Sequence, residues 1–252
     1  MRKIFSWVWE NILFLETLVL LAFIPLFPKL PLLDIKNTWV YIRGEDFVVL
    51  FVLLSWLALL FKKKITLRTP LTIPILIFWL VGGIATIHGI LIIFPTIANV
   101  FSNVAFLNLL RHIEYMSLFF IAYHGMRDRR LLPWVIGVLV ITLFAVIFYG
   151  FGQKYLGFPA YLTMNEEFAK GIPIHLSSLS RVPSTFAGHY DLAAYLVFII
   201  PILVSLIFGI KNWIIKIILM FSALLGFILL FMTVSRISFF VIFASLFIVF
   251  FF

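Results

Sequence analysis

Two short polar clusters in an otherwise apolar chain carry residue types that could do chemistry. The first is Arg181-Val182-Pro183-Ser184-Thr185, followed by His189 and Asp191, and the second is Thr233-Val234-Ser235-Arg236. A guanidinium group presents a planar fork of donors that matches phosphate oxygens, and hydroxyl groups add further donors. Two arginines with hydroxyl neighbours therefore suit a phosphate or a pyrophosphate. The alternative, in which both arginines only reach toward lipid head groups, stays open.

The other polar residues form no catalytic pattern of a soluble enzyme. The five histidines show no pair with the i, i+4 spacing of a metal site, and the chain has no cysteine. The adjacent Glu166 and Glu167 are typical of a solvated loop. Ser184, Thr185 or Asp191 also has the right type to cap a following helix. We therefore expect no metal and no cofactor.

The composition indicates a membrane protein. Of the 252 residues 64% are hydrophobic and 12% are charged, whereas a soluble domain is about 45–50% apolar and about 25% charged. A chain of this size cannot bury so much apolar surface, including 31 Phe, within its own core. A soluble enzyme, a disordered tail and a nucleic-acid-binding protein are excluded. The net charge of +9 is then a signal of membrane orientation, and no nucleic-acid partner is expected.

Eight apolar stretches approach the length of about 20 residues that a helix needs to cross the hydrocarbon layer. No alternating pattern of barrel strands is present, so we predict an all-α, polytopic integral membrane protein. A single transmembrane domain covers residues 1–252, with an external loop at 152–189. The predicted helices are 11–27, 45–61, 71–94, 104–124, 131–151, 190–210, 213–232 and 237–252.

Basic residues predict the orientation of these helices. With a cytoplasmic N-terminus, the short inner loops hold 11 of the 19 Lys and Arg residues, and the outer segments hold most of the acids. Both arginine clusters then lie on the external face of the cytoplasmic (inner) membrane. The chain ends within an apolar run with no basic anchor, so we expect a truncated sequence. The inner basic residues are Arg2, Lys3, Lys62, Lys63, Lys64, Arg68, Arg127, Arg129, Arg130, Lys211 and Lys216.

Ionisable residues inside predicted membrane helices are functional hypotheses by default. Arg111 and Glu114 are three residues apart on one helix and can pair locally. Glu16 can meet Arg111 if the first and fourth helices touch. Either a buried ion pair fixes the packing, or these groups line a proton or substrate path.

At its polar clusters the chain resembles the O-antigen ligase and polymerase superfamily. The resemblance also includes Leu110-Arg111-His112-Ile113-Glu114-Tyr115 in the fourth helix. Tyr190-Asp191 stands where Pro-Asn is common and Ile237 where Gly is common, which leaves the substrate subtype open. The residues matching the two main motifs are Arg181, Ser184, Thr185, Phe186, Leu192, Ala193, Thr233, Ser235 and Arg236.

This resemblance implies a metal-independent membrane glycosyltransferase of the GT-C kind. It would move a glycan from an undecaprenyl-diphosphate carrier to an acceptor glycolipid, glycan or protein. Arg181 and Arg236, with Ser184, Thr185 and Ser235, would hold the pyrophosphate, and Arg111, Glu114, His189 and Asp191 would form a second layer. The catalytic base is expected beyond Phe252, so this chain alone is expected to be inactive. A transporter or flippase, and a non-catalytic membrane scaffold, remain alternatives.

Overall fold

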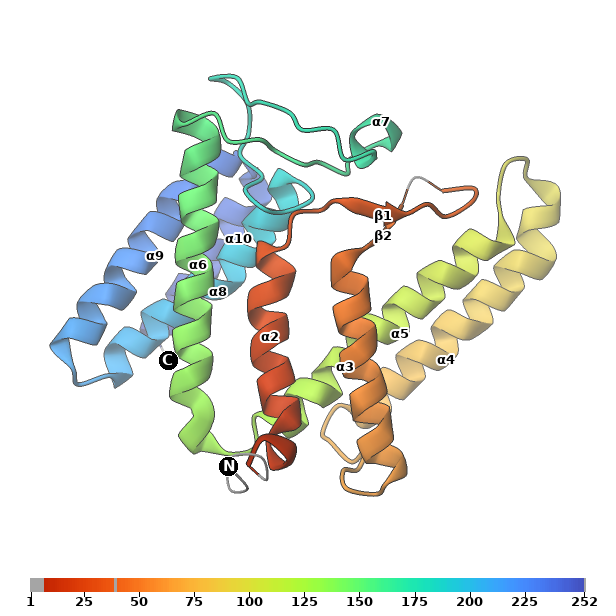
Figure 1. Cartoon of the computed structure of the whole chain (residues 1–252), viewed down its shortest axis with the longest axis horizontal. Coiled ribbons are helices and arrows are strands. Elements are labelled where there is room, and N and C mark those ends of the chain that lie inside the picture. Colours follow the sequence, from red (N-terminus) through yellow and green to blue (C-terminus); the bar gives the residue numbers. More distant parts are fainter. Residues whose placement is uncertain (1–6, 39, 252) are drawn as a thin grey trace. The chain divides into compact units, whose positions relative to one another are not determined.

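A computed structural model describes residues 7–38 and 40–251 of the chain. Contacts within it group these residues into two units (Figure 1). The first unit comprises residues 7–20, 35–38 and 46–132, and the second comprises 21–34, 40–45 and 133–251. The single transmembrane domain expected from the sequence stays a prediction, and each unit is described by itself.

Each of the eight predicted stretches corresponds to one helix, and the all-α fold is confirmed. The largest differences are that α6 continues to Tyr155, and that α4 ends at His88 before a π-helical turn at Gly89–Ile93 and a 3-10 turn at Phe94–Thr96. The eight helices are α2 (Ile12–Leu26), α3 (Gly44–Phe61), α4 (Thr72–His88), α5 (Ser102–Gly125), α6 (Leu132–Tyr155), α8 (His189–Gly209), α9 (Trp213–Thr233) and α10 (Arg236–Phe251).

Length and composition make this a polytopic membrane protein. Six helical segments in the described chain have at least 18 residues and are apolar enough to span a bilayer, and α2 and α10 are shorter apolar helices of 15 and 16 residues. Large apolar side chains point outward along these segments, for example Ile73 of α4 and Phe198 of α8. Such side chains are stable only where lipid replaces water.

In the first unit the core is aromatic. Trp56 of α3 stacks on Phe120 of α5 with 5.9 Å between ring centroids, and Trp79 of α4 lies 6.2 Å from the same ring. Near the end of α5, Gly125 approaches the backbone of α2 so closely that a β-carbon would lie 2.7 Å from the Leu13 carbonyl oxygen. A small residue at a helix crossing is how membrane helices pack tightly without a hydrophobic driving force.

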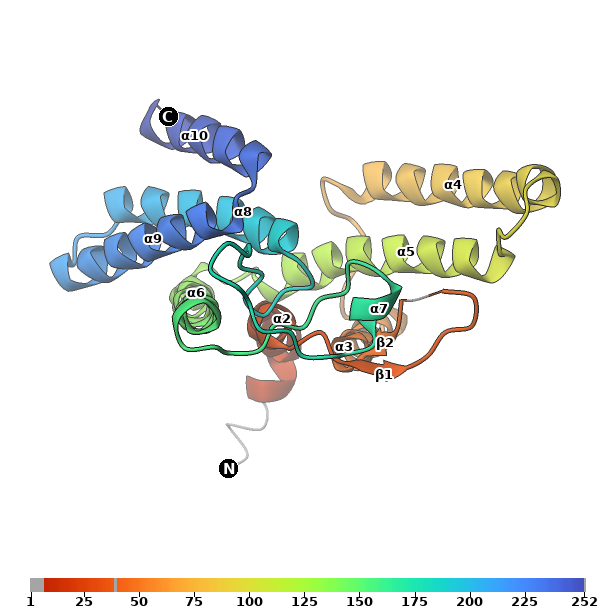
Figure 2. The same cartoon turned by 90° about the horizontal axis from the view of Figure 1, so that it is seen from above.

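In the second unit α8 lies between α9 and α10 (Figure 2). The core is aliphatic and consists mainly of branched side chains from α6, α8, α9 and α10. Gly150 of α6 lets Leu229 of α9 approach to the position that a β-carbon would occupy. This packing fixes the ends of α6, α8 and α9, from which the polar clusters extend.

The segments that follow α2 and α6 contain short regular structure. The segment after α2 forms an antiparallel pair of strands, β1 (Pro31–Leu33) and β2 (Ile42–Arg43). The segment after α6 contains the short helix α7 (Glu166–Ala169), whose first turn is capped by the side chain of Asn165. An isolated bridge joins Ala160 to Ile174. The segment between α6 and Arg181 is therefore held by backbone hydrogen bonds and by the cap of α7.

Cysteine labelling is expected to report the orientation without background, because the chain has no native cysteine. Ser178 and Lys63 are both exposed, so Ser178→Cys and Lys63→Cys each present an accessible thiol. If the N-terminus is cytoplasmic, an impermeant thiol reagent should label Ser178→Cys in intact cells and Lys63→Cys only after permeabilisation. The reverse pattern would place both arginine clusters on the cytoplasmic side.

Candidate functional site

The two arginine clusters predicted from the sequence belong to segments that are bonded to each other. The backbone N–H of Val182 donates to the carbonyl oxygen of Met232 at 3.1 Å, near the end of α9. That bond docks the loop before α8 onto the turn before α10. Arg181 and Arg236 flank this junction in sequence, and both are exposed.

Arg181 is oriented by the first residues of α8. Its Nη1 lies 2.9 Å from His189 Nε2 and 3.5 Å from the Tyr190 hydroxyl oxygen. The ring centroids of His189 and Tyr190 are 4.1 Å apart. A guanidinium group only donates, so His189 Nε2 must be the acceptor and the imidazole is neutral with its proton on Nδ1. The described residues provide no other hydrogen bond to the Arg181 guanidinium. Its remaining N–H groups are open to an anion.

Ser184 and Thr185, predicted to contact substrate, donate their hydroxyl protons to backbone carbonyls instead. Ser184 Oγ is 2.7 Å from the Val146 oxygen in α6, and Thr185 Oγ1 is 2.5 Å from the Pro25 oxygen in α2. Ser184 is only 1% exposed. Its φ of 52° is left-handed, which is uncommon for a residue other than glycine. In this structure both hydroxyls position the loop that carries Arg181.

Two residues of α6 hold the same loop, and the sequence did not indicate that they would. Gln153, 1% exposed, donates through Nε2 to the oxygens of Ser184 at 2.9 Å and Pro159 at 3.1 Å. Lys154 donates to the carbonyl oxygens of Ser178 and Ser180, the latter at 3.2 Å. No sequence spacing indicates these partners, because they lie 6 to 31 residues away along the chain.

The second cluster forms the tight turn between α9 and α10. Thr233 and Ser235 are buried, Thr233 Oγ1 donates to the Leu230 oxygen at 2.7 Å, and Ser235 Oγ lies 2.8 Å from Ser238 Oγ. Val234 has a φ of 54°, which is strained for a β-branched residue. Arg236 begins α10 and is exposed. Its guanidinium group has no hydrogen bond or ion pair within residues 7–38 and 40–251.

The helix-capping role considered for Ser184, Thr185 and Asp191 is wrong for α8. Its N-cap is Gly188, and no side-chain cap hydrogen bond is present. Asp191 is exposed in the first turn, where a carboxylate interacts favourably with the positive end of the helix dipole. His189 and Asp191 therefore both lie in the first turn of α8.

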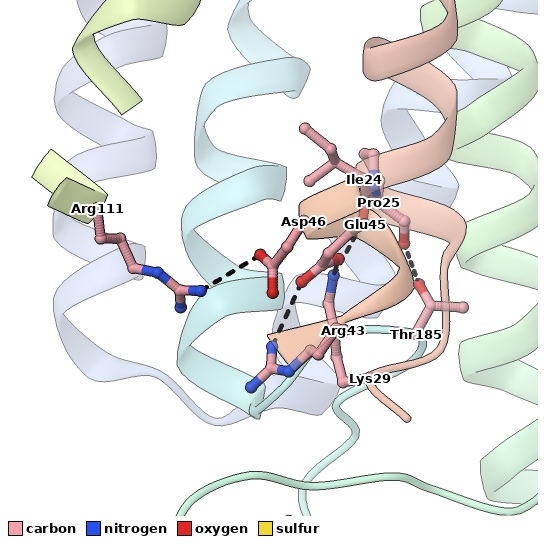
Figure 3. A network of polar contacts seen from close by, with 8 residues as sticks. All are labelled: Ile24, Pro25, Lys29, Arg43, Glu45, Asp46, Arg111 and Thr185. Carbon is pink, nitrogen blue, oxygen red and sulfur yellow. Dashed lines mark hydrogen bonds and ion pairs between the residues drawn. The ribbon is translucent and has the colours of Figure 1, made fainter. Parts of the chain in front are cut away.

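The ion pairs lie elsewhere in each unit (Figure 3). In the first unit Arg111 Nη2 pairs with Asp46 Oδ1 of α3 at 3.3 Å. The partners expected from the sequence were Glu114 and Glu16. In the second unit Glu45 binds Lys29 through Oε2 and lies 3.4 Å from Arg43 through Oε1. Lys29 also donates to the Ile24 oxygen at 3.0 Å, near the end of α2. The predicted second-layer residues Arg111 and Glu114 thus belong to the first unit.

Glu16 is a separate candidate in the first unit. Its side chain is 7% exposed within α2, and neither carboxyl oxygen makes a hydrogen bond of normal geometry among the described residues, with the Ser55 side chain of α3 as its polar neighbour. A buried carboxyl group without a normal hydrogen bond is unusual in a folded protein. In the described part of the chain, no three His, Asp or Glu side chains are close enough together to hold a metal ion.

The junction brings together the start of α8, the end of α9 and the start of α10. Two exposed guanidinium groups flank a backbone bond, and buried hydroxyl and amide groups fix the loop beneath one of them. Comparison of the chain with protein-family models, with curated proteins and with solved structures finds no match.

Proposed function

We propose that the protein binds the diphosphate of an undecaprenyl-linked glycan at the junction of the Arg181 loop and the Arg236 turn, and serves the transfer of that glycan to an acceptor at the external face of the membrane. The observation that carries the proposal is the bond from Val182 N to Met232 O. This bond joins the loop that carries Arg181 to the turn that carries Arg236.

The chemistry of the two side chains supports an anionic ligand. Arg181 contacts the neutral His189 and the Tyr190 hydroxyl through Nη1 and has its other N–H groups open, and Arg236 is exposed without a described partner. Preorganised guanidinium groups stabilise negative charge where it develops, and a departing diphosphate gains charge as the glycosyl bond breaks. The proposed role is therefore to bind the carrier and to stabilise the leaving group.

Binding of the carrier lipid tests this proposal directly. The purified protein in nanodiscs should bind undecaprenyl diphosphate at least about tenfold more tightly than undecaprenyl monophosphate, since the second phosphate adds charged hydrogen bonds of about 1.5–3 kcal/mol each. A metal chelator should not weaken binding, because the proposal assigns the phosphate contacts to guanidinium groups. Equal affinity for the two lipids would contradict it.

Transport of a polar or lipid-linked substrate is a second candidate, and the buried Glu16 favours it. Ionisable side chains inside membrane helices are rare and often mark proton or substrate paths. Glu16→Gln should abolish flipping of a lipid-linked substrate in proteoliposomes if the protein is a transporter. Under the transferase proposal, Glu16→Gln should leave binding of the diphosphate lipid unchanged.

A further inference from the structure

A cavity of about 820 Å³ lies in the first unit, separate from the arginine junction. It is bounded by the start of α2, the segment after α3 and the end of α5 with the turn that follows. Apolar side chains, among them Ile12, Leu59 and Leu131, form much of its wall, and several polar and charged side chains complete the lining. Helices that span a membrane end at the level of the phospholipid head groups, so the cavity lies at that level.

Four charged side chains line this cavity without neutralising one another. Lys64 and Arg127 are cationic, Glu10 and Asp128 are anionic, and no ion pair of the described chain joins any two of them. Asp128 Oδ1 accepts from the Arg130 backbone N–H at 2.9 Å, which leaves Oδ2 open. A ligand that carries both signs of charge would match such a lining better than a simple anion.

His124 adds a third acceptor to the two carboxylates. Its Nδ1 lies 2.7 Å from the Phe120 carbonyl oxygen, which can only accept, so Nδ1 carries the proton. In the neutral imidazole Nε2 is then an acceptor in the cavity lining. A primary ammonium group has three N–H donors, and Glu10, Asp128 and His124 supply three acceptors around one space.

We propose that this cavity binds the head group of a zwitterionic phospholipid with a primary ammonium group, that is, phosphoethanolamine on a diacylglycerol. Arg127 and Lys64 take the phosphate, while Glu10, Asp128 and His124 take the ammonium. The apolar wall receives the glycerol and the first part of the acyl chains. This site is independent of the glycan-transfer proposal.

The charge pattern discriminates among membrane lipids. An anionic head group such as phosphatidylglycerol would satisfy the two cations but leave Glu10 and Asp128 without a partner. Phosphatidylcholine carries the same net charge as phosphatidylethanolamine, but its quaternary ammonium has no N–H to donate. Each missing charged hydrogen bond is expected to weaken binding by about tenfold or more.

Lipid retention measures this preference. The full chain, purified from nanodiscs that contain equal amounts of phosphatidylethanolamine, phosphatidylglycerol and phosphatidylcholine, is examined by native mass spectrometry. Phosphatidylethanolamine should be retained about tenfold over each of the others. Arg127→Gln should reduce retention of all three lipids. The double variant Glu10→Gln with Asp128→Asn should bring phosphatidylethanolamine to parity with phosphatidylglycerol.

Matched controls come from the same helix ends. Lys62→Gln and Arg129→Gln remove exposed cations that do not line the cavity, and both should keep the wild-type preference. Equal retention of the three lipids by the wild type would overturn the proposal, and so would an effect of the controls as large as that of Arg127→Gln. Soluble phosphoethanolamine that binds as tightly as the lipid would overturn the assignment to a membrane lipid.

Discussion

Replacing Arg181 or Arg236 by alanine is expected to weaken binding of undecaprenyl diphosphate by about 10- to 100-fold. Hydrogen bonds to charged groups contribute about 1.5–3 kcal/mol each, and about 1.4 kcal/mol corresponds to a factor of ten. Arg→Lys at either position should recover only part of the loss, because an ammonium group is a point charge without the planar fork. At Arg181 it would also lose the guanidinium geometry that meets His189. Affinity is measured in nanodiscs, alongside the folded fraction.

Lys170→Ala is the matched control, since Lys170 is an exposed cation of the same loop between α6 and α8 and lies outside both clusters. It should bind the lipid like the wild type. Lys154 is unsuitable as a control because its ammonium group holds the carbonyls of Ser178 and Ser180. If the arginines only reach toward head groups, Arg→Lys should be silent at both sites. Wild-type affinity in both alanine variants would refute the assignment.

Gly125→Ala is expected to destabilise the protein by about 1–3 kcal/mol, the usual effect of overpacking. A β-carbon at this position would lie 2.7 Å from the Leu13 oxygen, 2.8 Å from Thr17 Oγ1 and 2.9 Å from the Leu13 carbonyl carbon. Two of these atoms are backbone, so the clash requires α5 and α2 to move apart. For a chain of this size the apparent Tm in detergent should fall by about 2–4 °C per kcal/mol.

Gly137→Ala provides the comparison for this substitution. Gly137 is also helical, in α6, but nothing lies within 4 Å of the β-carbon position. The same change there should be neutral or slightly stabilising, because alanine has the higher helix propensity. Equal Tm values for the two variants would show that the close approach of α5 and α2 does not contribute to stability.

The helices could be predicted from the sequence because lipid imposes one simple requirement. A span of apolar residues must form a helix of a certain length, and this holds for each segment by itself. The irregular end of α4 and the extension of α6 to Tyr155 were not predicted, because helix ends depend on what they contact. Orientation and membrane identity stay predictions from the distribution of Lys and Arg.

The anion site stays a prediction, and the contacts of its residues could not be predicted from the sequence. The order and type of residues around Arg181 and Arg236 indicated one anion site, and the Val182–Met232 bond joins the two segments. The partners were not predictable, because a partner depends on tertiary packing. Arg111 pairs with Asp46, 65 residues away, instead of meeting Glu16. Ser184 and Thr185 donate to carbonyls of α6 and α2, 38 and 160 residues away.

The bonds made by Val182 and Thr185 also restrict how the loop between α6 and α8 can move. They satisfy carbonyl groups near the ends of α9 and α2, which have no partner within their own helices. If the loop lifted away alone, each of those carbonyls would lose its hydrogen bond, at about 0.5–1.5 kcal/mol where water replaces the donor. Movement of this loop alone is therefore disfavoured, and we expect it to stay docked on the ends of α9 and α2. Slow hydrogen exchange at the Val182 amide, compared with the exposed Ser178 amide, would report this docked state.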